Sequence, residues 1–273
     1  MWSDTIQQIQ EVQRNAKRNG CPLWFRGQND ASWTLRSSMH RYVNDAIAKV
    51  RKVPQKLSNE EGKIAFMREA YKTLFHKFKA RAIQLLPAHE RSDWGLIFAM
   101  QHLGLPTRLL DWTESFSCAA YFAQRGRDPS NDAAIFIFAP ELHNQEIVGN
   151  PGVVFLGGAA NTPSVVTTHQ YHPGVVCNGS DMETLAVQPE LTNARMVAQR
   201  SAFTLCGSSF QPLEERYPKS IRRFLLPSSD FHDTQDFLQL SGQNHFALCP
   251  DLEGLRVHLL EGMKEEVDLA QED

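Results

Sequence analysis

The feature that most constrains this chain is residues 101–123, which read QHLGLPTRLLDWTESFSCAAYFA. Gly104 and Pro106 interrupt its first half, because both residues break regular structure and proline disfavours a helical conformation just before it. Its second half is apolar and rich in small residues, which favours a closely packed helix. We therefore predict a polar loop leading into a buried helix, with Asp111 or Thr113 as its N-cap.

A polar loop before a buried helix holds side chains and N–H groups in fixed positions, which suits the binding of an anion or cofactor. The residues in this loop that could do so are Arg108, Asp111, Trp112 and Thr113. The alternative is a loop that only closes the core, in which Arg108 and Asp111 pair with each other.

Arg26 is a second candidate, because it follows the apolar residues 23–25 and precedes Gly27. An arginine at the end of a strand can bind a phosphate or carboxylate through two parallel hydrogen bonds. A glycine beside it would let a ligand approach the backbone. The alternative is an arginine held in a structural ion pair or by loop carbonyls.

Hydrophobic patterning predicts a single α+β domain over residues 1–273. We expect helices to surround a small mixed or antiparallel β core, with residues 141–190 as a loop-rich insertion over the site. The predicted helices span 3–19, the start of 39–58, 59–86, 92–103, 230–242 and 252–263, followed by a frayed acidic tail at 265–273. The predicted core strands are 23–26, 134–138, 202–206 and 222–226, with shorter candidates at 33–36, 153–155 and 175–177.

Composition excludes several classes of protein. Hydrophobic residues make up 42% and charged residues 22%, which is typical of a folded chain. The net charge of −3 argues against broad affinity for nucleic acid or membranes. Five scattered cysteines fit a reducing compartment, and no signal peptide or apolar run of about 18 residues is present. We therefore expect a cytoplasmic location without membrane contact.

Common catalytic and metal-binding motifs are absent from the sequence, so no metal is expected. The chain nevertheless resembles the FRG domain family, named for the motif that stands here as Phe25-Arg26-Gly27. The similarity continues through 33–38, QHLGLPTRLLDWT at 101–113, AAYFA at 119–123, NARMVAQRSAFT at 193–204 and CPDLEGL at 249–255. Ser201 and Cys249 depart from the family pattern, where glycine and an aromatic residue are usual.

The order of these motifs is similar to that of ADP-ribosyltransferases, which implies NAD as the substrate. The resemblance implies that Arg26 binds the pyrophosphate and that Trp112 or Tyr121 flanks nicotinamide. The catalytic candidates are Asp111 and Gln199, of which only Asp111 can supply negative charge. The cofactor-binding candidates are Arg26, Gly27, Thr107, Arg108, Trp112, Thr113 and Tyr121.

Two hypotheses follow. The first is an NAD-consuming enzyme, such as a bacterial toxin or phage-defence effector, with a protein or nucleic acid as acceptor. The second is a non-catalytic module that binds a nucleotide or nucleic acid through its arginines, namely Arg26, Arg36, Arg41, Arg108 and Arg195. Under the enzyme hypothesis, one pocket should bring together Arg26, Arg108, Asp111 and Gln199. Asp111 would be either the catalytic carboxylate or the buried partner of an arginine.

Overall fold

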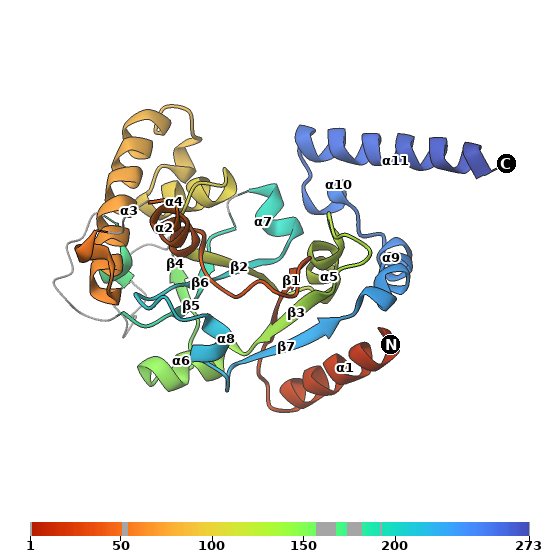
Figure 1. Cartoon of the computed structure of the whole chain (residues 1–273), viewed down its shortest axis with the longest axis horizontal. Helices are drawn as coiled ribbons and strands as arrows, with labels where there is room; N and C mark the ends of the chain where they lie inside the picture. The colour runs from red at the N-terminus through yellow and green to blue at the C-terminus, as the bar shows by residue number, and fades with distance from the viewer. Residues whose placement is uncertain (1, 51–53, 157–167, 174–181, 192, 273) are drawn as a thin grey trace.

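The computed structural model describes residues 2–50, 54–156, 168–173, 182–191 and 193–272. Seven strands form one sheet in the order β4-β5-β6-β2-β1-β3-β7 (Figure 1). Strands β4 and β5 are parallel, and every other neighbouring pair is antiparallel. The strands are β1 (Trp24–Gln28), β2 (Leu109–Thr113), β3 (Ala133–Phe138), β4 (Val154–Leu156), β5 (Leu185–Pro189), β6 (Ser201–Leu205) and β7 (Ile221–Leu226). The predicted α+β class with a mixed sheet is confirmed.

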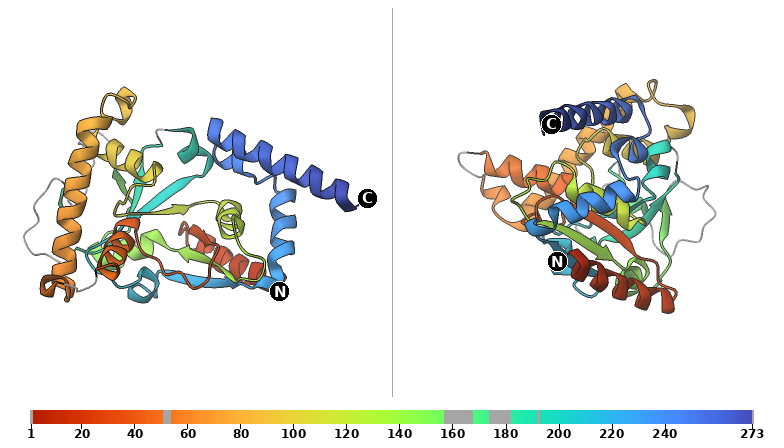
Figure 2. Two further views of the ribbon diagram at one scale, coloured as in Figure 1. Left: turned by 45° about the horizontal axis from the view of Figure 1, so that its top comes forward. Right: turned by 90° about the vertical axis from the view of Figure 1, so that its right-hand side faces the viewer.

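Helices surround this sheet, and Figure 2 shows α3 at one end of the molecule with α9 and α11 at the other. The α-helices are α1 (Trp2–Arg18), α2 (Ser38–Ala48), α3 (Glu60–Ala82), α4 (Asp93–His102), α5 (Phe116–Gln124), α6 (Pro140–Val148), α7 (Ala194–Ala198), α8 (Leu213–Arg216), α9 (Phe231–Leu240), α10 (His245–Leu248) and α11 (Leu252–Glu272). Short 3₁₀ helices are η1 (Gln55–Leu57), η2 (Ala88–Glu90), η3 (Thr168–Tyr171) and η4 (Ser228–Asp230).

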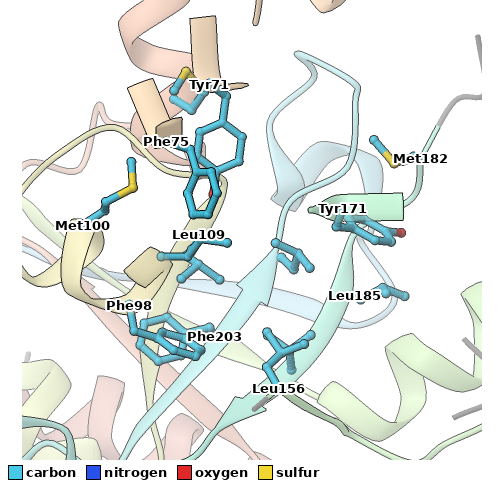
Figure 3. Close-up of a cluster of buried hydrophobic side chains, with 14 of the residues drawn as sticks. Tyr71, Phe75, Phe98, Met100, Leu109, Leu156, Tyr171, Met182, Leu185 and Phe203 are labelled. Atoms are coloured by element: carbon cyan, nitrogen blue, oxygen red, sulfur yellow. The ribbon is translucent and has the colours of Figure 1, made fainter. Parts of the chain in front are cut away.

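The strongest sequence patterns gave the expected elements. The apolar run predicted as a central strand is β3, all of whose residues are buried between β1 and β7. Helix α3 begins after Asn59, whose side chain accepts a hydrogen bond from the Gly62 N–H at 2.9 Å. Its apolar stripe packs Tyr71 and Phe75 into the largest buried cluster, between α3 and the β2 half of the sheet (Figure 3).

The prediction of a loop before the buried helix was wrong, because residues 109–113 form β2, a central strand. Pro106 and Gly104 mark only the turn that precedes it. Strand β2 pairs with β6 over five residue pairs, and it places Leu110 and Trp112 in a buried cluster. Helix α5 then begins later than predicted, and Ser115 is its N-cap, whose Oγ accepts a hydrogen bond from the Cys118 N–H at 3.3 Å.

Residues 33–36 do not form the predicted strand. The backbone N–H of Leu35 donates instead to the Glu214 carboxylate at 3.0 and 3.2 Å, so a side chain satisfies it and no neighbouring strand is needed. Trp33 is 55% exposed, which leaves its ring at the surface beside β1.

The described part of region 141–190 contains most of α6 and two strands, and the candidate at 153–155 corresponds to β4. Whether the region is a loop-rich insertion stays a prediction. Strand β5 pairs with β6 through Val187 and so extends the main sheet. The candidate strand at 175–177 lies outside the described residues. The acidic tail predicted to fray continues α11 as far as Glu272.

A buried histidine on α2 gives a prediction about acid stability. His40 is 3% exposed, its Nδ1 hydrogen-bonds Ser37 Oγ at 2.7 Å, and burial together with the charge of Arg108 lowers its pKa to about 3. Between pH 6.5 and about 3 the unfolded chain therefore binds a proton at His40 that the folded chain does not. The free energy of unfolding should therefore decrease as the pH is lowered from 6.5 to about 3, by up to about 1.4 kcal/mol per pH unit.

Denaturant unfolding at several pH values checks this expectation. His40→Gln should flatten the dependence on pH, whereas the substitution of exposed His232 by Gln should leave the wild-type slope. Equal slopes in all three proteins would refute the assignment.

Candidate functional site

The sheet opens between β1 and β2. These strands share one residue pair, Phe25 with Thr113, whereas β1 and β3 share five. In this antiparallel register the next pairs would be Arg26 with Trp112 and then Gly27 with Asp111, but neither pair forms. A pocket of about 360 Å³ lies at the opening. Its polar and aromatic lining comprises Phe25, Arg26, Gln28, Asn29, Trp33, Gln101, Asp111, Trp112, Thr113, Phe122, Arg125, Arg195 and Gln199.

The Arg26 side chain bridges the diverging strands. Its Nη1 donates to the backbone carbonyl of Asp111 at 2.7 Å and lies 3.7 Å from the Asp111 carboxylate. Burial lowers the pKa of Arg26 and Asp111 opposes this effect, but a guanidinium stays charged in proteins. Arg26 Nε is buried and has no hydrogen-bond partner in the described part of the chain. The arginine therefore retains a donor for a ligand.

The Asp111 carboxylate is exposed and held by a second contact. Gln101 Nε2 donates to Asp111 Oδ2 at 2.8 Å, and Thr107 Oγ1 in turn donates to Gln101 Oε1. The Asp111 side chain is 56% exposed, against 20% for Arg26. Asp111 is therefore not the buried partner of an arginine. Thr107 itself is fully buried, so it orients Gln101 and is not placed to touch a ligand.

Gln199 links the pocket to the C-terminal helices. Its Nε2 donates to the Leu248 carbonyl at 3.0 Å and lies 3.6 Å from Cys249 Sγ. The backbone carbonyl of Gln199 accepts a hydrogen bond from Thr113 Oγ1 at 2.6 Å. The residue thus lines the pocket while its amide fixes α10, and its neutral side chain cannot stabilise a cation as a carboxylate does.

The pocket brings together three of the four residues expected to converge. Arg26, Asp111 and Gln199 line it, but Arg108 does not. The Arg108 guanidinium points to the other side of β2, where Nη2 donates to the Cys206 carbonyl at 2.6 Å. The sequence analysis placed Arg108 in a loop. Because it instead lies directly before β2, the register of the sheet fixes the direction of its side chain. The alternative of an Arg108–Asp111 pair fails for the same reason.

The two predicted nicotinamide-flanking residues are engaged in packing. Trp112 is 3% exposed, stacks on Phe138 with ring centroids 5.0 Å apart, and donates from Nε1 to Thr204 Oγ1 at 3.1 Å. The Tyr121 hydroxyl hydrogen-bonds His245 Nδ1 at 2.9 Å, and its residue does not line the pocket. Trp112 nevertheless lines the pocket, as do Phe25, Trp33 and Phe122, and of these four aromatic residues Phe25 and Trp112 are buried.

Gly27 serves helix packing. A Cβ at this position would lie 1.9 Å from the Ala119 carbonyl oxygen and 2.6 Å from the Ala123 nitrogen. Helix α5 therefore rests directly on the strand, and this close packing requires a glycine. Gly27 also lines the pocket, so ligand approach at this position stays a prediction.

Several lining residues were not identified from the sequence. Arg125 follows α5, and its carbonyl accepts a hydrogen bond from Asn29 Nδ2 at 2.9 Å, which ties it to the end of β1. Gln101 begins the QHLGLPT motif, so its position in that motif was the available signal. Neither Asn29 nor Arg125 carried a comparable signal, because their proximity depends on how α5 packs on β1.

Comparison with known families was made against this geometry. Residues 22–132 match the family model described as FRG domain. The chain is similar to the FRG domain family over this segment. The matched segment contains β1, β2 and α5, and so supplies Arg26, Gln101, Asp111 and Arg125 to the pocket. Arg195 and Gln199 come from beyond it, and the extension of the family domain over 1–273 stays a prediction. No curated protein and no solved structure matched the chain.

Two further findings concern metal sites and membrane-spanning helices. In the described ranges, His, Cys, Asp and Glu side chains form no group of three or more that could hold a metal ion. No described helix has both the length and the hydrophobicity needed to cross a membrane.

Proposed function

We propose that this protein binds NAD in the pocket between β1 and β2 and cleaves it as an ADP-ribosyltransferase-like enzyme. The observation that carries this proposal is the position of Arg26 and Asp111, a charged donor and an exposed carboxylate in contact at the opening of the sheet. In a dinucleotide, the anionic pyrophosphate can bind to Arg26. The ribose carbon that becomes cationic during cleavage can be stabilised by Asp111.

Charge and size support a dinucleotide. The pocket is lined by three arginines, Arg26, Arg125 and Arg195, and one aspartate, a formal charge of +2 that matches a pyrophosphate. Its volume of about 360 Å³ is within the range typical of small-molecule sites. Trp33 and Phe122 offer ring faces against which a base can stack.

The proposed reaction breaks the bond between the nicotinamide nitrogen and the ribose carbon. The bonding electron pair leaves with nicotinamide, and the ribose carbon passes through an oxocarbenium-like state that the Asp111 carboxylate stabilises. A nucleophile on a protein or nucleic acid, or water, then bonds to that carbon and loses a proton. Gln101 holds the carboxylate in position through its 2.8 Å hydrogen bond.

The direct test is incubation of the purified protein with NAD, followed by chromatography for nicotinamide. Release of nicotinamide supports the enzyme. Saturable NAD binding without release supports the non-catalytic nucleotide-binding module, and absence of both refutes the proposal. Binding of nucleic acid through all five arginines is not favoured, because Arg108 is buried and Arg36 and Arg41 donate to backbone carbonyls.

Arg26 gives the sharpest test of binding. Arg26→Ala should abolish NAD binding, and Arg26→Lys should restore little of it, because a lysine cannot donate two parallel hydrogen bonds. Isothermal titration calorimetry with NAD measures the affinity. The exposed Arg222 on β7 lies outside the pocket, so Arg222→Ala is the matched control. Wild-type affinity in Arg26→Lys would contradict the bidentate role.

The biological setting that we propose follows from the family resemblance. An NAD-consuming activity in a cytoplasm would suit a toxin or phage-defence effector, because loss of NAD or modification of a target arrests growth. Induced expression in a bacterial host should then slow growth, and Asp111→Asn should restore it. Equal growth arrest by the wild type and by Asp111→Asn would show that the toxicity does not depend on the Asp111 carboxylate in the pocket.

A further inference from the structure

Arg108 is a buried cation, and no carboxylate of the residues that the structure describes forms an ion pair with it. Its residue is 4% exposed, Nη2 donates to the Cys206 carbonyl, and the guanidinium lies 5.4 Å from the centroid of the Tyr171 ring. After burial, the groups that act most on its pKa are Tyr71, Tyr171, Cys206 and Arg68, none of them a carboxylate. A buried charge without a counter-charge is costly, so its retention needs an explanation.

A small cavity lies against this arginine, between α3 and residues 170–173. Its volume is about 100 Å³, and Tyr71, Arg108 and Tyr171 are among its lining residues. Figure 3 shows Tyr71 on the α3 side of the buried cluster, with Tyr171 and Met182 across from it. The cavity is far below the roughly 300 Å³ of a typical small-molecule site, so it can take a group of a few heavy atoms but not a dinucleotide.

Two unused hydrogen-bond donors line this cavity. Arg108 Nε and the Tyr71 hydroxyl are both buried, and neither has a hydrogen-bond partner among the residues that the structure describes. Burial raises the pKa of Tyr71, and the nearby charge of Arg108 only partly offsets this, so the hydroxyl keeps its proton. Unsatisfied buried donors in a cavity indicate a missing acceptor.

The charges around the cavity favour an anion. Arg68 and Lys72 on α3 also line it, and together with Arg108 they give three cationic side chains. Glu69 is the acidic residue among the lining residues, and it is exposed, so solvent screens its charge. An oxyanion in this position would supply both the acceptor for two donors and the counter-charge for Arg108.

We propose that this cavity is a binding site for a small oxyanion, a phosphate or carboxylate group, which accepts hydrogen bonds from Arg108 Nε and the Tyr71 hydroxyl. The site lies on the other side of β2 from the NAD pocket and shares none of its lining residues. The inference does not depend on the proposed enzymatic activity.

Thermal melting with inorganic phosphate and, separately, with acetate tests the proposal, with sodium chloride at matched ionic strength as the reference. One of the two anions should raise the melting temperature of the wild-type protein saturably, and the better one identifies the group that the site takes. Tyr71→Phe removes only the hydroxyl and should weaken that binding about tenfold, as expected for a lost hydrogen bond to a charged group. Arg26→Ala should leave it unchanged.

Arg108→Met removes the charge while roughly keeping the length of the side chain, and it should abolish the shift. If this variant does not fold, Tyr71→Phe alone decides, because it removes only the hydroxyl and keeps the aromatic ring in the buried cluster. A wild-type protein that responds to neither anion overturns the proposal. So does a response that Tyr71→Phe keeps in full, or one that Arg26→Ala removes.

Discussion

Gly27→Ala should destabilise the protein by on the order of 3 kcal/mol or more, enough to prevent folding if the wild-type stability is ordinary. The reason is that the added Cβ meets backbone atoms of α5, at 1.9 Å from the Ala119 oxygen, and no rotamer change can move them. Helix α5 would have to shift away from β1, which would open the cluster of Phe25, Ala119 and Ala123. Thermal or denaturant unfolding of the purified variant, or its yield of folded protein, measures the effect.

The matched control is Gly262→Ala on α11, where an added Cβ would meet nothing within 4 Å. Alanine is favoured over glycine inside a helix, so this change should stabilise α11 slightly. A Gly27→Ala variant as stable as the wild type would show that α5 does not rest on β1 as described.

Asp111→Asn should lower the rate of NAD cleavage about a hundredfold while leaving the melting temperature nearly unchanged. Loss of the negative charge removes on the order of 3 kcal/mol of transition-state stabilisation. The fold should tolerate the change for two reasons. Arg26 makes its 2.7 Å hydrogen bond to the backbone carbonyl, and the exposed carboxylate contributes at most about 1 kcal/mol through its ion pair.

Turnover and melting of this variant should be measured side by side, with Asp233→Asn, an exposed position on α9, as the control. Full activity in a folded Asp111→Asn protein would remove Asp111 from the mechanism. The enzyme proposal would then lack a carboxylate, because Gln199 is neutral and its amide is engaged by α10.

Much of the fold could be predicted from local patterns, such as the continuous apolar run of β3 and the apolar stripe of α3. Strand β2 was missed because four of its five residues, LLDWT, are buried, so apolar and polar residues do not alternate, and because a glycine and a proline precede it closely. Only the pairing partner β6, some 90 residues later, makes this segment extended. Such long-range pairing is not visible in a local window.

The candidate site was predicted in part for the same reason. Motif residues Arg26 and Asp111 do meet in one pocket. The direction of Arg108, however, depends on the register of β2, and the contribution of Arg125 depends on how closely α5 packs on Gly27. Residue type and order along the chain therefore identified the candidates, while strand register and helix packing decided which of them share a cavity.

The backbone ladder of the sheet is weakest between β1 and β2. There its two parts, β4-β5-β6-β2 and β1-β3-β7, share one residue pair, Phe25 with Thr113, and the guanidinium of Arg26 adds a hydrogen bond across the opening. Buried side chains, such as Trp112 stacked on Phe138, also pack across it. The same guanidinium lines the pocket. A ligand that draws it away from the Asp111 carbonyl loosens the two halves, and one that binds both together tightens them. Ligand binding in the pocket should therefore change the stiffness of the sheet, and a change in that stiffness should change the affinity for the ligand.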